Sequence, residues 1–589
     1  MYSQYYSNNF FFNFLPSLLF LLLIFLCSFQ ISFYLKKRNF LFFDNSPSIV
    51  FVVLISLFTI LFNYLILLNY VSEIKSFFYF ATILILIFLF KNIKILLKIV
   101  LYLFKKKKYL NYLDKYKFLT LIIFFFISIL PLSDADSVVT HLYFSAKILT
   151  NNNLILDLPK DIELLSYLNS EVLLIIAAIL KSDNFGSQLN FFTLLLSFFF
   201  LKEKNNFQLL LLSCPLIIFF ISTQKLQLFF GLIYLFTVIY IFNFKIKNKI
   251  EIFLVCYLLI FYTSGKMYYS LFALPLFVIF LIKNKHFFKS IIFYSFVSFF
   301  LILFPILFKK YISFLNPLAP FFNNLFNHSN EFYEIVSLSL RSSEGWASNS
   351  FDIKYLLRPF VPTSFSTLSS TLGPVFILLL SNYKEIKKIF YIPYILVFFI
   401  IFTGQILPRY YFESFLILIY FVSSSFIVKI ICKIQLCVII SFSLIFCFIA
   451  YFQTNIFFSK DEFMRRFTFL YDRSSKISKF NFTENVLNLD QSRESIFLTN
   501  NHYGSRYLNA LKIFSPIEDY NKALIEFINK KKIKYITSNT KIYLPLCIKI
   551  KEVDSFSYSQ VQRNFLIASS NNKAYIYQII KNKCKINSN

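Results

Sequence analysis

The stretch FFFNFLPSLLFLLLIFLCSFQISFYL, from Phe10 to Leu35, decides what kind of protein this chain is. It is longer than the roughly 20 apolar residues that a helix needs to cross the hydrocarbon core of a bilayer. It is also too long for a cleaved signal peptide, and it lacks a basic start and a small-residue cleavage site. We therefore interpret it as a membrane helix that stays in the protein.

Similar apolar runs recur along the whole chain, whose 589 residues are 58% hydrophobic with a mean hydropathy of +0.65. A soluble core cannot hold so many apolar residues. We expect an α-helical polytopic membrane protein with about fourteen transmembrane helices. They are predicted near 10–35, 47–71, 76–90, 118–132, 186–201, 206–221, 226–244, 250–265, 267–283, 290–308, 370–382, 389–405, 411–428 and 434–452.

The net charge of +30 comes largely from lysine clusters between these runs, which is typical of cytoplasmic loops and not of nucleic-acid binding. All the clusters fall on one face if the N-terminus is outside. This predicts an integral plasma (inner) membrane protein, multi-pass, with both termini extracytoplasmic. The clusters lie at Lys36–Arg38, 91–117, Lys202–Lys204, Lys245–Lys249, Lys283–Lys289, Lys384–Lys388, and Lys429 with Lys433.

This topology places three long polar segments outside. Two are the loops 133–185 and 309–369 of the polytopic domain 1–452, and the third is the tail 453–589. In the tail we predict strands at Ser495–Asn500 and Ile533–Asn539, a helix at Asn521–Lys532, and a hairpin at Asn564–Ile580 that turns at Asn571–Asn572. These elements indicate a small extracytoplasmic α/β domain.

The cysteines and histidines give no metal-binding spacing, so we expect no zinc site. Cys547 and Cys584 both lie in the polar tail. The sequence leaves open whether they form a disulfide, which an extracytoplasmic location permits.

Acidic residues stand where the fourth apolar run ends, in LPLSDADSVVTHLYFSAKIL from Leu130 to Leu149. A carboxylate from Asp134 or Asp136 can take a proton from a nucleophile or hold a divalent cation. The alternative is that both acids form the solvated end of a helix or cap the next one.

The segment SDADSVVTHLYFSAKILTNNNLI resembles the first external loop of GT-C superfamily glycosyltransferases. It is closest to the bacterial branch that resembles the protein O-mannosyltransferases and the lipid A aminoarabinose transferases. Further resemblances follow in the expected order at Glu163–Leu201, FYTSGKMYYSLFALPLF (Phe261–Phe277), LNPLAPFF (Leu315–Phe322), LGPVFILLL (Leu372–Leu380) and QILPRYYFESFLI (Gln405–Ile417). In that family, amphipathic surface helices follow the acidic pair, which here correspond to 137–149 and 164–180.

Two departures from the family matter. Three helices precede the one that leads into the acidic loop, whereas the simplest members have none. The pair is Asp-x-Asp, not the Asp-Glu of the mannosyltransferases. Which aspartate is the base, and whether a divalent cation is needed at Asp134 and Asp136, therefore stay open.

The resemblance implies that a sugar moves from a polyprenyl-phosphate donor to a lipid, glycan or protein acceptor on the outer face. An aspartate of the pair, with Asp134 ahead of Asp136, then serves as general base. Lys266 and Arg409 are lone cations at outer helix ends and are candidates for the donor phosphate, although snorkelling explains them equally well. His141 is a third candidate for the phosphate or the sugar. Glu171, Arg341 and Arg358 are candidate substrate-binding residues.

Three other functions remain open. A polytopic transporter or lipid flippase of the cell envelope has this many helices, but it usually carries mid-membrane charges and internal repeats, and we find few such charges and no internal repeat. An O-antigen polymerase or ligase, and a membrane scaffold whose tail binds a partner, are the others. The sequence identifies neither the sugar nor the acceptor.

Overall fold

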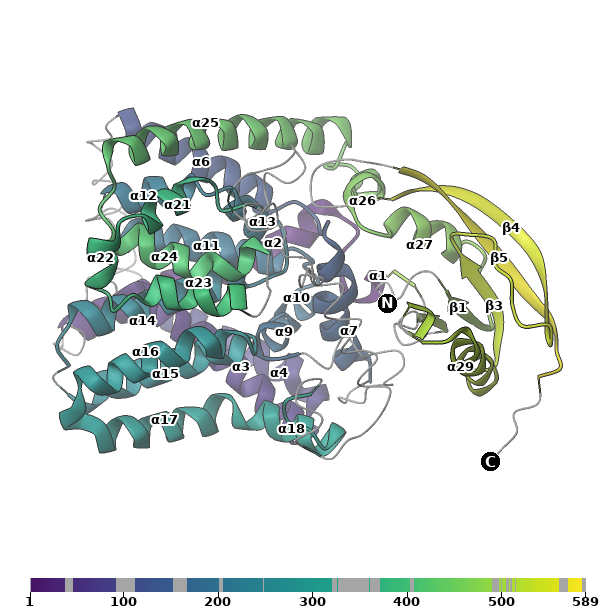
Figure 1. Cartoon of the computed structure of the whole chain (residues 1–589), viewed down its shortest axis with the longest axis horizontal. Helices are drawn as coiled ribbons and strands as arrows, with labels where there is room; N and C mark the ends of the chain where they lie inside the picture. Colours follow the sequence, from purple (N-terminus) through teal and green to yellow (C-terminus); the bar gives the residue numbers. More distant parts are fainter. Residues whose placement is uncertain are drawn as a thin grey trace.

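The computed structural model describes most of the chain. The described residues are 2–37, 46–91, 112–151, 167–200, 205–246, 248–319, 326, 360, 371–402, 407–489, 497–498, 501–504, 508, 511–513, 515–560 and 570–584. Within them the chain forms a bundle of helices followed by a smaller domain built on a β-sheet (Figure 1).

Five of the described helical segments are long and apolar enough to cross a membrane. They are Phe10–Leu35, Pro47–Leu67, Val71–Lys91, Lys285–Ile302 and Phe426–Gln453. Four shorter apolar helices accompany them, at Asn169–Ile179, Gln227–Asn243, Tyr269–Lys283 and Ile392–Phe402. The chain is therefore a mostly helical protein of membrane character, with far fewer full-length spans in its described part than the fourteen expected.

The helices follow the predicted apolar runs over most of the bundle. Their bounds are α2 Phe10–Lys37, α3 Ser46–Leu67, α4 Ile74–Lys91, α6 Tyr112–Ser128, α7 Leu142–Asn151, α9 Asn169–Leu173, α10 Ile175–Ile179, α11 Phe185–Phe200, α12 Asn205–Leu212, α13 Leu216–Ile221, α14 Gln227–Asn243, α15 Lys249–Gly265, α16 Tyr269–Lys283, α17 Phe288–Ile302, α18 Phe304–Phe314, α21 Val375–Leu380, α22 Tyr383–Lys387, α23 Ile392–Phe402, α24 Phe412–Phe421 and α25 Phe426–Phe448.

The structure differs from the predicted segments in several places. The run 290–308, for example, is divided between α17 and α18. The run 206–221 is divided between α12 and α13 just before Pro215, because proline cannot donate the backbone hydrogen bond that would continue a helix. The predicted loop at Lys429 and Lys433 is wrong, because both residues lie inside α25, which begins after its N-cap Ser425. The two lysines are one helical turn apart and exposed, so their charges do not interrupt the helix.

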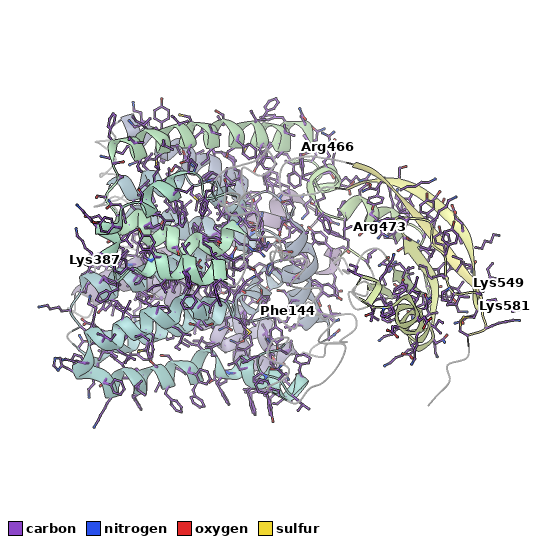
Figure 2. The ribbon with its side chains drawn as sticks, viewed as in Figure 1. Phe144, Lys387, Arg466, Arg473, Lys549 and Lys581 are labelled. Carbon is purple, nitrogen blue, oxygen red and sulfur yellow. A yellow bond between two sulfur atoms is a disulfide. The ribbon has the colours of Figure 1, made fainter. Side chains whose placement is uncertain are left out.

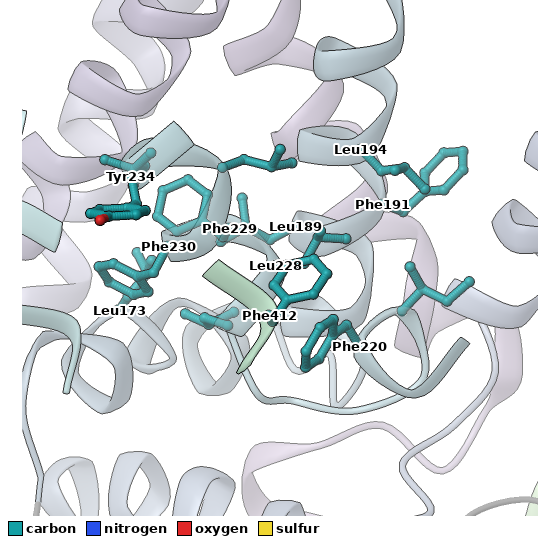
Figure 3. Close-up of a cluster of buried hydrophobic side chains, with 14 of the residues drawn as sticks. Leu173, Leu189, Phe191, Leu194, Phe220, Leu228, Phe229, Phe230, Tyr234 and Phe412 are labelled. Atoms are coloured by element: carbon teal, nitrogen blue, oxygen red, sulfur yellow. The ribbon is translucent and has the colours of Figure 1, made fainter. Parts of the chain in front are cut away.

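The core of the bundle is made of large aromatic and aliphatic side chains from helices far apart in the sequence (Figure 3). Phe220 of α13 and Phe412 of α24 are both fully buried, with ring centroids 4.8 Å apart. Phe229 and Phe230 of α14 lie beside them. This packing brings the N-terminal ends of α14 and α24 together, and that arrangement positions the candidate site.

The C-terminal domain has a five-stranded sheet in the order β2-β1-β3-β5-β4. Strands β1 (Asn485–Asn488), β2 (His502–Gly504) and β3 (Ile533–Ser538) are parallel, whereas β4 (Ile548–Gln560) and β5 (Ser570–Asn582) join as an antiparallel pair. Helices α26 (Asp461–Phe467) and α27 (Tyr471–Ser478) lie between the bundle and the sheet, and α29 (Ile517–Lys530) packs on β3.

The tail predictions have mixed outcomes. The strand at Ile533–Asn539 and the helix at Asn521–Lys532 are confirmed as β3 and α29. The turn at Asn571–Asn572 is wrong, because both asparagines lie inside β5 opposite Ser559 and Tyr558 of β4. The strand predicted at Ser495–Asn500 falls mostly outside the described residues. Cys547 and Cys584, left open by the sequence, form a disulfide.

One cross-strand pair of residues destabilises the sheet. Lys549 of β4 lies directly opposite Lys581 of β5, and like charges in this position are destabilising. We expect Lys581→Glu to stabilise the pairing of β4 and β5 by about 0.2–1 kcal/mol, measured as slower amide hydrogen exchange in both strands. Lys573→Glu is the control, because Lys573 lies opposite the neutral Ser557. Equal protection in both variants would contradict the prediction.

Candidate functional site

The acidic loop lies between α6 and α7, at the end of the bundle that faces the sheet domain (Figure 1). After α6 the chain runs without regular structure to Asp134, and Ser137 then begins a short π-helical turn that continues into α7. The Asp134 carboxylate accepts hydrogen bonds from the backbone N–H of Ser137, at 3.1 Å, and from the Ser137 hydroxyl. Asp134 therefore fixes the start of the turn that carries Asp136 and His141.

Asp134 is only 4% exposed. Burial raises the pKa of its carboxyl above the ordinary value, although the nearby charge of Lys225 opposes this shift. Both of its oxygens accept from Ser137, whose hydroxyl accepts in turn from the backbone N–H of Gln224 at 2.9 Å. Asp134 thus joins the acidic loop to the turn between α13 and α14.

Asp136 lies among cations that arrive from distant parts of the sequence. Its Oδ2 is 2.5 Å from Nζ of Lys225 and 3.6 Å from a terminal nitrogen of Arg409. Lys225 lies in the turn before α14, and Arg409 lies in the short 3-10 turn Pro408–Tyr411 before α24. The Asp136 side chain is 34% exposed, against 7% for Lys225 and 18% for Arg409. Asp136 is therefore the most solvent-accessible member of this cluster.

The backbone around Lys225 is held by a buried asparagine. Asn190 of α11 donates to the carbonyl of Lys225 at 2.7 Å and to that of Phe220 at 2.7 Å. Burial lowers the pKa of Lys225, and the neighbouring Arg409 lowers it further, while Asp136 raises it; the resulting pKa is about 8. Lys225 therefore carries its charge at neutral pH but loses it in mildly alkaline solution.

A second group forms around Glu171. Its Oε1 lies 3.2 Å from Nδ1 of His141, and its Oε2 accepts from the backbone N–H of Leu168 at 2.9 Å and from Ser170 at 2.8 Å. Burial by itself would raise the pKa of Glu171. The contact with His141 and the charge of Lys266 outweigh it and lower this pKa to about 2. Glu171 is therefore a carboxylate at neutral pH.

The turn that carries Lys266 is positioned by its neighbours. Ser170 donates to the carbonyl of Gly265 at 2.7 Å. A Cβ at Gly265 would lie 2.7 Å from the Phe230 ring, so only glycine allows α15 to end this close to α14. Two residues after Lys266, Tyr268 stacks edge-on against Tyr410, with centroids 4.6 Å apart. The Lys266 and Arg409 turns are therefore neighbours.

The linker to the sheet domain covers the acidic loop. Thr468 donates to the carbonyl of Leu132 at 2.6 Å, and the backbone N–H of Phe469 donates to that of Ser133 at 3.0 Å. Close by, Asp183 accepts from Asn13 at 2.6 Å and pairs with Lys460 at 3.2 Å. Both partners of this ion pair are almost completely buried.

The residues predicted to bind the donor phosphate lie in neighbouring turns but have different acidic partners. Arg409 lies beside Asp136, whereas His141 lies beside Glu171, and the charge of Lys266 lowers the pKa of Glu171. Arg341 and Arg358 lie outside the described residues. The two helices predicted to lie along the membrane surface pack inside the protein. Helix α7 is buried along nearly its whole length, and the described part of 164–180 forms the short buried helices α9 and α10.

The sequence reasoning missed Lys225 and Glu413. Lys225 is a lone cation between two helix ends that the sequence predicts to be on the outer side, which is the same signal that selected Lys266 and Arg409. Glu413 of α24 is 1% exposed and accepts a hydrogen bond from the Tyr262 hydroxyl at 3.2 Å. The sequence did not single out Glu413, because an acidic residue at the start of a helix is ordinarily solvated.

The described residues give no support for a divalent cation at Asp134 and Asp136, which the sequence left open. In the described part of the chain, no three His, Cys, Asp or Glu side chains are grouped as metal ligands would be. Asp136 also already lies beside two positive charges. We therefore assign no step to a metal.

No protein-family model, curated protein or solved structure matches this chain. The resemblance to the GT-C superfamily consequently depends on the sequence motifs alone.

Proposed function

We propose that this chain is an integral membrane glycosyltransferase that moves a sugar from a polyprenyl-phosphate donor to an acceptor on the extracytoplasmic face. The observation that carries the proposal is the meeting of Asp136 with Lys225 and Arg409. A carboxylate beside two cations, at the end of a bundle of apolar helices, supplies the charges that phosphate departure and proton removal require.

In the first step of the proposed reaction, Lys225 and Arg409 exchange Asp136 for the donor phosphate. The donor phosphate approaches Lys225 and Arg409 and competes with Asp136 for them. The released Asp136 carboxylate accepts the proton of the acceptor hydroxyl, whose oxygen attacks the anomeric carbon of the sugar. The bond from that carbon to the phosphate oxygen breaks, and the two cations stabilise the charge that the polyprenyl phosphate gains.

Asp136 is the better candidate for the base, in the reverse of the order expected from the sequence. A base must reach its substrate, and Asp136 is the more exposed of the two aspartates. Asp134 is buried and fully engaged with Ser137. We assign it a positioning role at the turn, and we assign contacts with the acceptor to the group of His141, Glu171 and Lys266.

The distribution of charge supports the proposed orientation. Lys387, from a predicted cytoplasmic cluster, lies at the end of the bundle opposite Phe144 of α7 and opposite the sheet domain (Figure 2). Because basic loops stay on the cytoplasmic side, the acidic loop and the sheet domain then lie outside. This is the topology expected from the sequence, with a multi-pass chain whose two termini are extracytoplasmic.

The experiment that tests the function is a transfer assay. The purified chain is placed in proteoliposomes with a radiolabelled polyprenyl-phosphate sugar and a membrane extract as acceptor. We expect label to move from the donor to the acceptor fraction. Movement of the donor across the bilayer without transfer would contradict the proposal and favour the flippase alternative.

The same assay has an expected pH dependence. The donor phosphate needs protonated Lys225, whose pKa is about 8, so kcat/KM should fall as the pH rises above this value. The fall should approach about tenfold for each further pH unit. Lys225→Arg should keep its activity to higher pH, because arginine stays charged. An identical fall in Lys225→Arg would show that another group is responsible.

A further inference from the structure

The sheet domain gathers positive charge at one end. We call this region the lysine end. All six of its lysines are exposed. The ion pairs that the structure shows in this domain and its linker are elsewhere, on α26 and α27. The lysine end comprises Lys530, Lys532, Lys534, Lys549, Lys581 and Lys583.

The fold brings these residues together from three parts of the sequence. Helix α29 ends at Lys530, and β3 starts at Ile533 beside it. Asn582, at the end of β5, donates to the side chain of Asn529 at 2.6 Å, so the end of β5 lies against the end of α29. The register of β4 then sets Lys549 opposite Lys581.

The disulfide fixes the same end of the sheet. Cys547 precedes β4 and Cys584 follows β5, with Cα atoms 5.1 Å apart. The backbone N–H of Lys583 donates to the carbonyl of Cys547 at 2.9 Å. The repulsion between Lys549 and Lys581 is therefore built into a rigid part of the domain. A charge arrangement that opposes folding here suits an anionic ligand that relieves it.

An exposed aromatic residue lies near these charges in the chain. Tyr543 is 95% exposed, and Leu546, directly before Cys547, is fully exposed at 100%. A tyrosine ring in water offers an apolar face for a sugar ring and a hydroxyl for hydrogen bonding. A ligand that has both acidic groups and sugar rings could use the lysines together with this tyrosine of the segment that leads into β4.

The position of the lysine end argues against a membrane surface. Lys549 and Lys581 lie at the end of the molecule away from the helical bundle (Figure 2). Attraction to lipid headgroups falls off within a Debye length, about 10 Å at ordinary salt. Lysines are also mobile point charges, which suits a polymer with repeated acidic groups better than one planar carboxylate.

We infer that the lysine end binds an acidic glycan, a sugar polymer that carries carboxylate or phosphate groups. This binding uses no residue of the Asp136 cluster, so it can be tested whether or not the chain transfers sugars.

The experiment uses the full chain in detergent micelles and measures binding to immobilised polygalacturonate, a carboxylated glycan. We expect salt-sensitive binding that dextran, a neutral glycan, does not show. The combined variant Lys532→Gln, Lys534→Gln, Lys549→Gln and Lys581→Gln should bind at least about tenfold more weakly. Replacing the same four lysines by arginine should preserve binding, which shows that charge and not folding is responsible.

A matched control removes equal charge elsewhere. It combines Lys479→Gln, Lys512→Gln, Lys522→Gln and Lys573→Gln, all exposed lysines of the same domain. We expect it to bind like the parent chain. Equal weakening in both glutamine variants would overturn the inference, as would tight binding to phosphatidylglycerol vesicles or to polyglutamate.

The contribution of the sugar rings is tested separately. Tyr543→Ala should weaken polygalacturonate binding without changing its salt dependence, because the tyrosine contacts the rings and not the charges. Unchanged affinity in Tyr543→Ala would overturn the assignment to a glycan.

Discussion

Asp136→Asn should lower kcat/KM for sugar transfer by about 10²- to 10⁴-fold, the range expected when a general base is removed. Asparagine keeps the size of the side chain but cannot accept the proton of the acceptor hydroxyl. It also removes the negative charge that holds Lys225 and Arg409 in place. The measurement is the initial rate of transfer in proteoliposomes at equal amounts of protein.

Two further variants show whether this loss belongs to the site. Asp461→Asn removes an aspartate that pairs with Arg465 at 2.7 Å on the surface of α26, and it should leave transfer unchanged. Asp134→Asn should reduce the rate less than Asp136→Asn, since Asp134 acts through the turn that it caps. A larger loss in Asp134→Asn would reverse the two roles.

Lys460→Met should destabilise the protein by about 3–5 kcal/mol, because it leaves the buried carboxylate of Asp183 without its cation. The Asp183–Lys460 pair joins α26 to the bundle, where Asn13 of α2 also binds Asp183. The change is measured as the shift in thermal unfolding of the detergent-solubilised chain. Transfer should fall as well, since α26 leads into the linker that covers the acidic loop.

The matched control lies on the same helix. Arg466→Met removes a cation from an ion pair of 2.7 Å with Glu462, but both side chains are nearly half exposed. Exposed pairs contribute only about 0–1 kcal/mol, so the unfolding temperature should hardly move. The double change Lys460→Met with Asp183→Asn should recover part of the lost stability. Equal effects of Lys460→Met and Arg466→Met would contradict the buried role of the pair.

The sequence predicted a mostly helical protein because apolar composition favours helices, but the described part of the chain has five helices long enough to cross a membrane and not fourteen. Runs such as Phe10–Leu35 have no alternative to helix in a bilayer. The sequence-based prediction failed where a structural element depends on partners that are distant in the sequence. The two asparagines at 571–572 form a good local turn signal, yet β4 supplies a partner strand that begins upstream of them. Likewise, Lys429 and Lys433 marked a loop only because their exposed position on α25 could not be foreseen.

The sequence predicted several charged residues of the candidate site, but it did not predict which of them lie together. The pattern of lone cations at helix ends predicted to be outside identified Arg409, and the same pattern was present at Lys225. Only the packing of α14 against α24 shows that these two lie beside Asp136, while His141 lies beside Glu171. Hydrophobic periodicity predicts which face of a single helix is buried. It does not predict which turns between helices lie next to each other.

The most direct test of the central claim is a cryo-electron microscopy structure of the full chain in lipid nanodiscs with bound polyprenyl phosphate. We expect the phosphate between Lys225 and Arg409, with oxygens about 2.7–2.9 Å from their nitrogens and with Asp136 displaced from Lys225. The lipid tail should enter the outer half of the bilayer. A phosphate bound away from these two cations, or an acidic loop on the cytoplasmic side, would contradict the account.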